Sequence, residues 1–365
     1  MKWLVRIMQK RVLVAVFLVS AISICVPQSA GAIEKPRLES SVLPEVRTSN
    51  AQYSDDTVSY RMTDEQAMAA YEYWTEDRLK EAFENRIDTI AEDVEEDGIP
   101  SIDAEDDITT TFQPVEPAYP NNGVSTLSGF SPDSSSSPTG LLALTVNGQP
   151  ATCTASLVNS SSKKLLVTAA HCLHGGKGGG WHGNYMFTPN AGPHGGQQMF
   201  PGGVARVFND WIANANPDDL SASDIANDVG FLTINTSVLP PALVNLVAQY
   251  GGHGFGHSNL GSFDATIVGY PANPGNNFIP QSCISKVETA APFGFGKVLQ
   301  AKECSFVNGH GASGGPWLQL YDATTGVGWV NSVTSGSPLN STVLRGPRFD
   351  DRVYEMYTTA NNDGL

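Results

Sequence analysis

Apolar residues in the second half of the chain come in short runs, with turn-forming residues between them. Short runs bounded by glycine, proline, asparagine and serine are typical of strands. Asn147-Gly148, directly after the first run, is a strong hairpin signal. The pattern predicts an antiparallel barrel or sandwich, and residues 140–365 are long enough for two small barrels, with a short final helix over 348–357. The predicted strands cover residues 141–146, 155–158, 165–170, 231–234, 265–270, 317–320 and 329–333.

A helical periodicity replaces this pattern between residues 63 and 90. Apolar residues recur there at near-helical spacing with charges between them, which predicts an amphipathic helix over 63–90 that packs on another part of the chain. Thr63-Asp64-Glu65-Gln66 resembles a capping box at its start. The recurring apolar residues are Met68, Tyr71, Trp74, Leu79, Phe83 and Ile87.

Charge divides the chain into three parts. The formal net charge is −16, and residues 1–32, 33–120 and 121–365 carry +4, −16 and −4 of it. Residues 91–107 hold nine acids and no base, which is typical of a solvated, flexible segment. A strongly acidic balance argues against nucleic acid as the main partner.

The N-terminus has the pattern of an export signal. Lys2, Arg6, Lys10 and Arg11 precede an apolar stretch over 12–26 that is too short for an ordinary membrane span. Small residues at 30–32 suit a cleavage site. We therefore predict a signal peptide over 1–32, a secreted (extracellular) product and no membrane contact after its removal. The less favoured alternative is a membrane anchor.

The region between the signal and the predicted strands suggests a precursor. Residues 33–120 are interpreted as an acidic prosegment, with a separate small helical domain as the alternative. Residues 112–139 are rich in proline and serine, which predicts a place for proteolytic maturation. Residues 121–139 are then a linker, and residues 140–365 are the main domain.

Four cysteines remain after signal removal, and an even number in an exported chain suggests two disulfides. Of the three possible connectivities we favour the pairing of neighbours along the chain. Each bridge would close a loop of roughly 20 residues and contribute roughly 3 kcal/mol of stability. The favoured bridges are Cys153–Cys172 and Cys283–Cys304.

The candidate chemistry centres on a serine among glycines. A serine hydroxyl becomes a useful nucleophile only beside a base and near backbone donors for the developing oxyanion. Ser313 lies in GASGGP at residues 311–316, and His171 lies in TAAHC at residues 168–172, after an apolar run. Asp228, directly before a predicted strand, lies between them in the chain, with Asp224 as the alternative aspartate. Each motif alone also fits an ordinary turn or structural residue, but together they predict acyl transfer by a Ser-His-Asp triad.

These motifs, in the order His171, Asp228, Ser313, resemble those of the chymotrypsin-like (trypsin-fold) serine peptidases. The resemblance runs from about residue 140 to the C-terminus. Within that family the chain looks closest to secreted microbial peptidases related to the glutamyl endopeptidases. The tripeptides that suggest this branch are FTP at 187–189, GYP at 269–271 and VNS at 330–332. The resemblance implies an all-β fold of two six-stranded antiparallel barrels, preceded by a helical acidic prosegment.

The resemblance also implies roles for single residues. Ser313 would be the nucleophile, His171 its base and then an acid, and Asp228 the residue that orients the imidazole. The N–H groups of Gly311 and Ser313 would form the oxyanion hole. The Cys153–Cys172 bridge would hold the loop of His171. Ser332 would support the aspartate and pair with the substrate backbone, and the implied substrate-binding set is Val307, His310, Ser332 and Thr334.

This chain departs from the family pattern at several positions. Ala312 replaces the frequent aspartate that pairs with a freed N-terminus, so we expect activation by removal of residues from 33 to a point within 112–139. Val307, six residues before Ser313, supplies no acid to bind arginine or lysine. Asn331 stands where glutamyl enzymes carry a histidine. His310 offers a contact for an acidic side chain, and a small or apolar residue before the cleaved bond fits equally well.

We therefore predict a secreted serine endopeptidase that is made as a precursor and acts as a monomer on peptide or protein substrates, without a cofactor or a metal. Its prosegment would be an intramolecular inhibitor or a folding aid. A catalytically inactive binding protein on the same scaffold is the alternative, and an esterase with the same triad is a third possibility. The remaining histidines are interpreted as residues of glycine-rich loops, and they are His174, His182, His194, His253 and His257.

Overall fold

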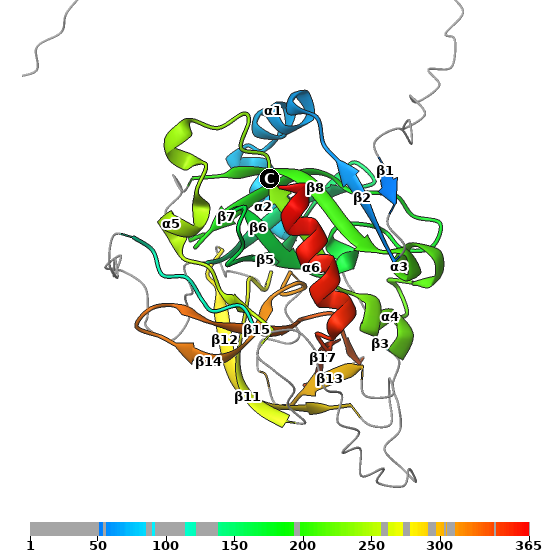
Figure 1. Ribbon diagram of the computed structural model, residues 1–365. Helices are drawn as coiled ribbons and strands as arrows, with labels where there is room; N and C mark the ends of the chain where they lie inside the picture. The colour runs from blue at the N-terminus through cyan, green and yellow to red at the C-terminus, as the bar shows by residue number, and fades with distance from the viewer. Residues whose placement is uncertain are drawn as a thin grey trace, which may run out of the picture. The chain divides into compact units, whose positions relative to one another are not determined.

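The first barrel is formed by six antiparallel strands in a computed structural model of the chain (Figure 1). In spatial order they are β8 (Phe200–Phe208), β7 (Gly183–Pro189), β4 (Thr139–Val146), β5 (Gln149–Val158), β6 (Leu165–Thr168) and β9 (Gly230–Ile234). A pairing between β8 and β9 closes the barrel. Asn147 and Gly148, with φ of 51° and 80°, make the predicted turn between β4 and β5. Large side chains fill the interior, among them Leu142, Leu157, Phe187 and Phe231.

A second sheet of seven strands follows along the chain. Its order is β10 (Gly254–Phe255), β15 (Val327–Val333), β14 (Pro316–Asp322), β11 (Ser262–Gly269), β12 (Gln281–Thr289), β13 (Val298–Ala301) and β17 (Leu344–Pro347). Every neighbouring pair is antiparallel except β10 and β15. β17 is the last strand in this order. Its Arg345 carbonyl accepts from the amide of Ser335, just after β15, at 2.9 Å, so the segment that follows β15 contacts β17 as well. Ile267, Val287 and Trp317 are fully buried in the core of this sheet.

The structure describes residues 51–53, 56–84, 90–91, 114–121, 138–192, 198–256, 262–272, 278–290, 297–302, 304, 311–338 and 341–364. The predicted signal peptide, nearly all of the acidic run and most of the linker lie outside the described residues. Val307, His310, His194 and His257 lie outside them as well. In the part that the structure describes, no helix is long and apolar enough to cross a membrane.

The predicted all-β class and the barrel organisation are confirmed. Each predicted strand coincides with an observed one, at β4, β5, β6, β9, β11, β14 and β15. The apolar pattern missed β7, β8, β12 and β13, because glycine, proline and polar residues interrupt them. In β12, for example, the inward positions include the buried Ser285, whereas Ile284 is 80% exposed.

Residues ahead of the barrels are built into the first sheet. β2 (Thr57–Arg61), which also pairs with β1 (Ala51–Tyr53), lies antiparallel to β8 over five residue pairs. Two helices follow, α1 (Asp64–Tyr73) and α2 (Glu76–Glu84). The Thr63 hydroxyl accepts from the Gln66 amide at 3.2 Å and the Gln66 side chain accepts from the Thr63 amide at 2.8 Å, which confirms the capping box.

The single helix predicted over 63–90 is wrong. The helix ends at Trp74, whose backbone is extended, and the indole Nε1 of Trp74 donates to the Asn184 carbonyl of β7 at 2.6 Å. Burial of this side chain against the first barrel outweighs the helical periodicity, because propensity is weak beside tertiary packing. Ile90–Ala91 is a short strand, β3, that runs parallel to β16 (Ser337–Pro338).

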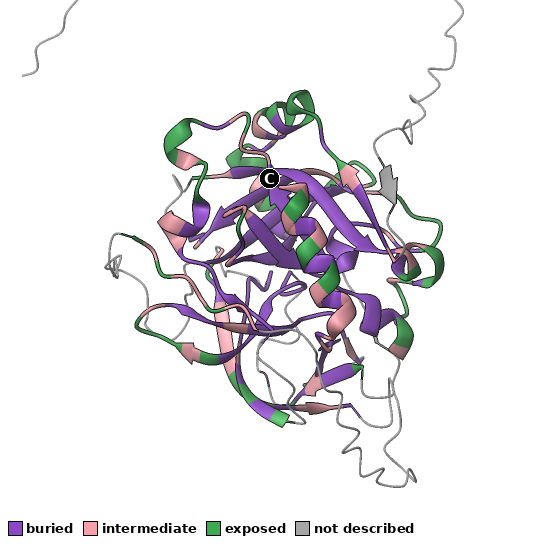
Figure 2. Cartoon of the chain, in the orientation of Figure 1, coloured by how far each residue is buried: buried purple, intermediate pink, exposed green. Residues whose placement is uncertain are grey.

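Of the remaining helices, α3 (Asn209–Asn214), α5 (Leu246–Tyr250) and α6 (Asp351–Asp363) pack on strands of the first barrel, whereas α4 (Ala222–Asn227) contacts β13 and β17 of the second sheet. α3, α4 and α5 are short, and 3₁₀ turns occur at Ala170–Cys172 and Pro241–Leu243. The final helix, α6, begins later and runs longer than predicted. It lies across β8 and β9, buried on its inner side and exposed on its outer side (Figures 1 and 2). The Arg206 guanidinium of β8 holds it through the Asp363 carboxylate at 2.8 Å.

Candidate active site

His171 sits just beyond the end of β6, in the 3₁₀ turn Ala170–Cys172, and is buried. The Cys153–Cys172 disulfide ties this turn to β5, and the other predicted bridge, Cys283–Cys304, is also present. Both favoured pairings are therefore confirmed. Cys153, His171 and Cys172 form the one group of potential metal ligands found among the described residues, but the disulfide uses both thiols.

Three side chains fasten the backbone around His171. The His182 ring bonds the His171 carbonyl at 3.1 Å, the Tyr185 hydroxyl donates to the Leu173 carbonyl at 2.6 Å, and the Trp211 indole donates to the His174 carbonyl at 2.9 Å. Burial lowers the pKa of His182 to about 4, so its ring is neutral and Nε2 carries the donated hydrogen. The sequence placed His174 and His182 in loops, but it did not reveal that both are buried.

Asp228 is the C-cap residue of α4, two residues before β9, and is fully buried. Its Oδ1 accepts from the His171 amide at 2.9 Å and its Oδ2 from His171 Nδ1 at 2.7 Å. A carboxylate cannot donate, so Nδ1 carries the hydrogen and Nε2 presents a lone pair. Asp224 instead bonds the Ser221 amide and hydroxyl, at 3.0 and 2.8 Å, in the capping box of α4.

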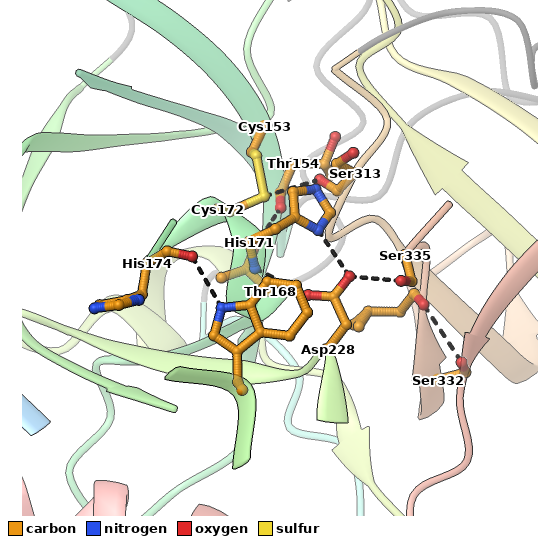
Figure 3. A network of polar contacts seen from close by, with 12 residues as sticks. Cys153, Thr154, Thr168, His171, Cys172, His174, Asp228, Ser313, Ser332 and Ser335 are labelled. Carbon is orange, nitrogen blue, oxygen red and sulfur yellow. Dashed lines mark hydrogen bonds and ion pairs between the residues drawn. A yellow bond between two sulfur atoms is a disulfide. The ribbon is translucent and has the colours of Figure 1, made fainter. Parts of the chain in front are cut away.

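The serine that supports the aspartate is Ser335. Its hydroxyl donates to Asp228 Oδ2 at 2.5 Å (Figure 3). The prediction that Ser332 has this role is wrong, because the Ser332 hydroxyl points to the Pro347 carbonyl, 2.7 Å away. Ser332 lies inside β15 and is paired with Trp317, whereas Ser335 follows the strand where the chain turns toward the first barrel. Ser332, Ser335 and Ser337 lie within six residues of the sequence, so the sequence alone did not show which of them contacts Asp228.

Ser313 faces the free side of the His171 ring. Figure 3 shows the ring nitrogen that is not bonded to Asp228 directed at Ser313. Among the described residues this Nε2 atom is buried and has no hydrogen-bond partner. Ser313 itself is 8% exposed. His171, Asp228 and Ser313, which lie far apart in the sequence, are thus brought close together, with the imidazole between the carboxylate and the serine.

Glycines let the Ser313 turn pack tightly between the barrels. Gly314 has a φ of +79°, and a Cβ there would collide with the Thr168 hydroxyl and the Thr154 carbonyl. A Cβ at Gly315 would collide with the Val268 carbonyl. The glycines of this motif are therefore required by the close approach of β5, β6 and β11.

The amides of Gly311 and Ser313 lie in the turn that carries the serine, where the resemblance predicts an oxyanion hole. Gly311 has a φ of +90°, which only glycine adopts readily. No residue in the described part of the chain accepts a hydrogen bond from either amide. An oxyanion hole needs backbone donors of this kind, so the geometry is compatible with the predicted role.

Of the four residues predicted to bind substrate, the structure describes Ser332 and Thr334. Thr334 is buried, and its hydroxyl accepts from the Trp317 indole at 3.0 Å. Asn331 is also buried, and its side-chain amide donates to Gln319 Oε1 at 2.8 Å.

Solved structures resemble this chain, although no protein-family model and no curated protein matches it. The protease Anisep from Arthrobacter nicotinovorans covers 63% of this chain and 98% of its own, with a TM-score of 0.53 and 23% identity. The thermostable serine protease AL20 from an extremophilic microorganism covers 62% and 98%, with a TM-score of 0.50 and 24% identity. A Glu endopeptidase covers 64% and 94%, with a TM-score of 0.46 and 14% identity.

At these identities the likeness establishes the fold alone. The chain has the chymotrypsin-like fold of the serine proteases, as its motifs predicted. The likeness to the Glu endopeptidase is too weak to argue from, so the link to that branch stays a prediction.

Proposed function

We propose that this chain is a secreted serine endopeptidase that hydrolyses peptide bonds through an acyl-enzyme. The observation that supports it best is the His171 ring, whose Nδ1 is held by Asp228 while its unpartnered Nε2 faces Ser313. Fold likeness to serine proteases agrees with this function.

The geometry suggests the order of steps. His171 Nε2 takes the proton of Ser313 as its oxygen attacks the substrate carbonyl, and Asp228 stabilises the resulting imidazolium. The amides of Gly311 and Ser313 bind the oxyanion. His171 then passes the proton to the leaving amine, and a water molecule, activated by the same ring, releases the acyl group from Ser313.

The precursor is part of the same proposal. The signal peptide over 1–32 would direct export, and cleavage within 112–139 would release a monomeric peptidase. The backbone of Ile90–Ala91 pairs with Ser337–Pro338, two residues beyond Ser335, which suits a prosegment that covers a substrate-binding edge. The bonds from Tyr71 and Trp74 to the first barrel also suit a folding aid.

A fluorophosphonate probe tests the function. The wild-type protein should be labelled once, at Ser313, and should cleave a peptide library. Ser313→Ala and His171→Ala should each abolish labelling. Ser223→Ala, which removes an exposed hydroxyl on α4, is the matched control and should label like the wild type. A folded wild-type protein that neither labels nor cleaves after cleavage within 112–139 would contradict the proposal and favour an inactive binding protein.

A further inference from the structure

Thr154 of β5 is fully buried and contacts the nucleophile turn with its backbone and its side chain. Its amide donates to the Ser313 carbonyl at 2.7 Å, and its hydroxyl donates to the Gly311 carbonyl at 2.9 Å. Thr154 belongs to the first barrel, whereas Gly311 and Ser313 precede β14 of the second sheet. One residue therefore holds the turn of the nucleophile from the opposite half of the molecule (Figure 3).

The direction of the Thr154 hydroxyl is fixed by a second bond. Its oxygen accepts from the Tyr270 amide at 2.9 Å, so its single hydrogen is available for the Gly311 carbonyl. The Thr154 carbonyl accepts in turn from the Thr168 hydroxyl at 2.8 Å, three residues before His171. Thr154 thus links the segment of the base to the segment of the nucleophile.

The held carbonyls fix the two peptide planes that follow Gly311: the Thr154 hydroxyl holds the plane between Gly311 and Ala312, and the Gly315 amide holds the plane between Ala312 and Ser313. In a trans peptide the N–H and C=O groups point in opposite directions. The Ala312 carbonyl accepts from the Gly315 amide at 2.9 Å, which turns the Ser313 amide the other way. Gly311, at a φ of +90°, has no side chain to restrict it, so the bond to its carbonyl is its main restraint from the first barrel.

Position 312 cannot supply another restraint. In the family pattern an aspartate at this position forms an ion pair with a freed N-terminus, but Ala312 has no polar side-chain atom. We propose that Thr154 is a positioning residue whose hydroxyl holds Gly311 in the oxyanion-binding arrangement, in place of an ion pair at position 312. This inference rests on the proposed peptidase function.

Substitutions that differ by the hydroxyl alone test the inference in the protein expressed as the full chain and assayed after cleavage within 112–139. Thr154→Val keeps the branched shape and the amide bond to Ser313 but loses both side-chain bonds, and Thr154→Ser keeps the hydroxyl. Thr152→Val, two residues earlier on β5, is the matched control, because Thr152 is equally buried and its hydroxyl has no partner among the described residues. Initial rates on a peptide found by the library digest, fluorophosphonate labelling rates and melting temperatures are measured for each protein.

We expect kcat of Thr154→Val to fall by about 10- to 100-fold, with KM within about twofold, because a displaced donor acts on the transition state and not on substrate binding. Labelling should slow in parallel. Thr154→Ser should lie within about threefold of the wild type, and Thr152→Val should be unchanged. If Thr154→Val does not fold, the ratio of Thr154→Ser to Thr154→Ala isolates the same hydroxyl.

The two proposals fail differently. An active wild type with an equally active Thr154→Val would overturn the inference and leave the peptidase function intact. Equal losses in Thr154→Val and Thr152→Val would also overturn it, because the effect would then come from packing of β5. A wild type that neither labels nor cleaves overturns the peptidase function, and the inference fails with it.

Discussion

The two barrels hold their parts of the candidate site in different ways. The first barrel fastens His171 with groups of its own: a disulfide beside it, three side chains on the surrounding carbonyls, and two bonds from Asp228. The second sheet presents Ser313 on a turn of glycines and one alanine, which offers no polar side chain besides the serine. Thr154, which holds that turn, comes from the first barrel.

This difference teaches where the site is vulnerable. The base keeps its disulfide, its backbone bonds and its two bonds to Asp228 as long as the first barrel is folded, although Asp228 also takes one bond from Ser335, beyond β15 of the second sheet. The nucleophile and the oxyanion donors depend in addition on how the two halves dock. Substitutions in the first barrel should therefore act through the imidazole, whereas substitutions at the junction should act through the alignment of Ser313.

The largest effect is expected at the aspartate itself. Asp228→Asn should lower kcat by about 10⁴-fold, because an amide no longer accepts with both atoms and the imidazole adopts the wrong tautomer. Peptide hydrolysis by the purified variant measures it. Asp224→Asn, four residues earlier, is the control and should keep kcat within about twofold of the wild type. Similar losses in both variants would contradict the assignment of Asp228.

Buried neutral histidines should make the folded chain sensitive to acid. Burial lowers the pKa of His182 to about 4 and that of His253 to about 3. The unfolded chain takes up protons below about pH 6.5 while the folded chain does not, so stability is full above that pH and falls toward pH 4. Each such histidine adds up to about 1.4 kcal/mol per pH unit to this loss.

His253 allows a test of that slope. Its Nδ1 accepts from the Gly328 amide at 3.3 Å and its Nε2 bonds the Thr139 hydroxyl at 3.0 Å, so glutamine is a neutral substitute. Urea unfolding of Ser313→Ala, with and without His253→Gln, measures stability between pH 7 and 4 without self-digestion. We expect a shallower acid slope with His253→Gln. An unchanged slope would mean that His253 takes up its proton in the folded chain.

The smallest effect is expected at Ser335, the serine beyond β15 that bonds Asp228. Ser335→Ala removes one bond to Asp228 and leaves both bonds to His171, so kcat should fall by about tenfold. Ser332→Ala loses a bond of similar length to the Pro347 carbonyl but no contact with Asp228. Measured side by side, Ser335→Ala should have the lower kcat. The reverse order would restore the role that the sequence motif assigned to Ser332.

Much of the fold and the candidate site followed from local patterns. The hairpin at Asn147-Gly148, the capping box at Thr63 and the apolar strands each depend on neighbours along the chain, which the sequence displays directly. The two disulfides followed from the count and spacing of four cysteines. The motifs around His171 and Ser313 carried the prediction of the triad.

Other features became visible only in the folded molecule. Trp74 ends a helix because it donates to Asn184, and no local pattern near either residue announces that bond. Ser335, His182 and Thr154 act on partners that lie 107, 11 and 157 residues away, through single hydrogen bonds. The sequence by itself determined which residue types are present and which segments become strands. The tertiary structure decided which hydroxyl meets which acceptor, because a hydrogen bond depends on distances of about 3 Å that only the docking of two barrels sets.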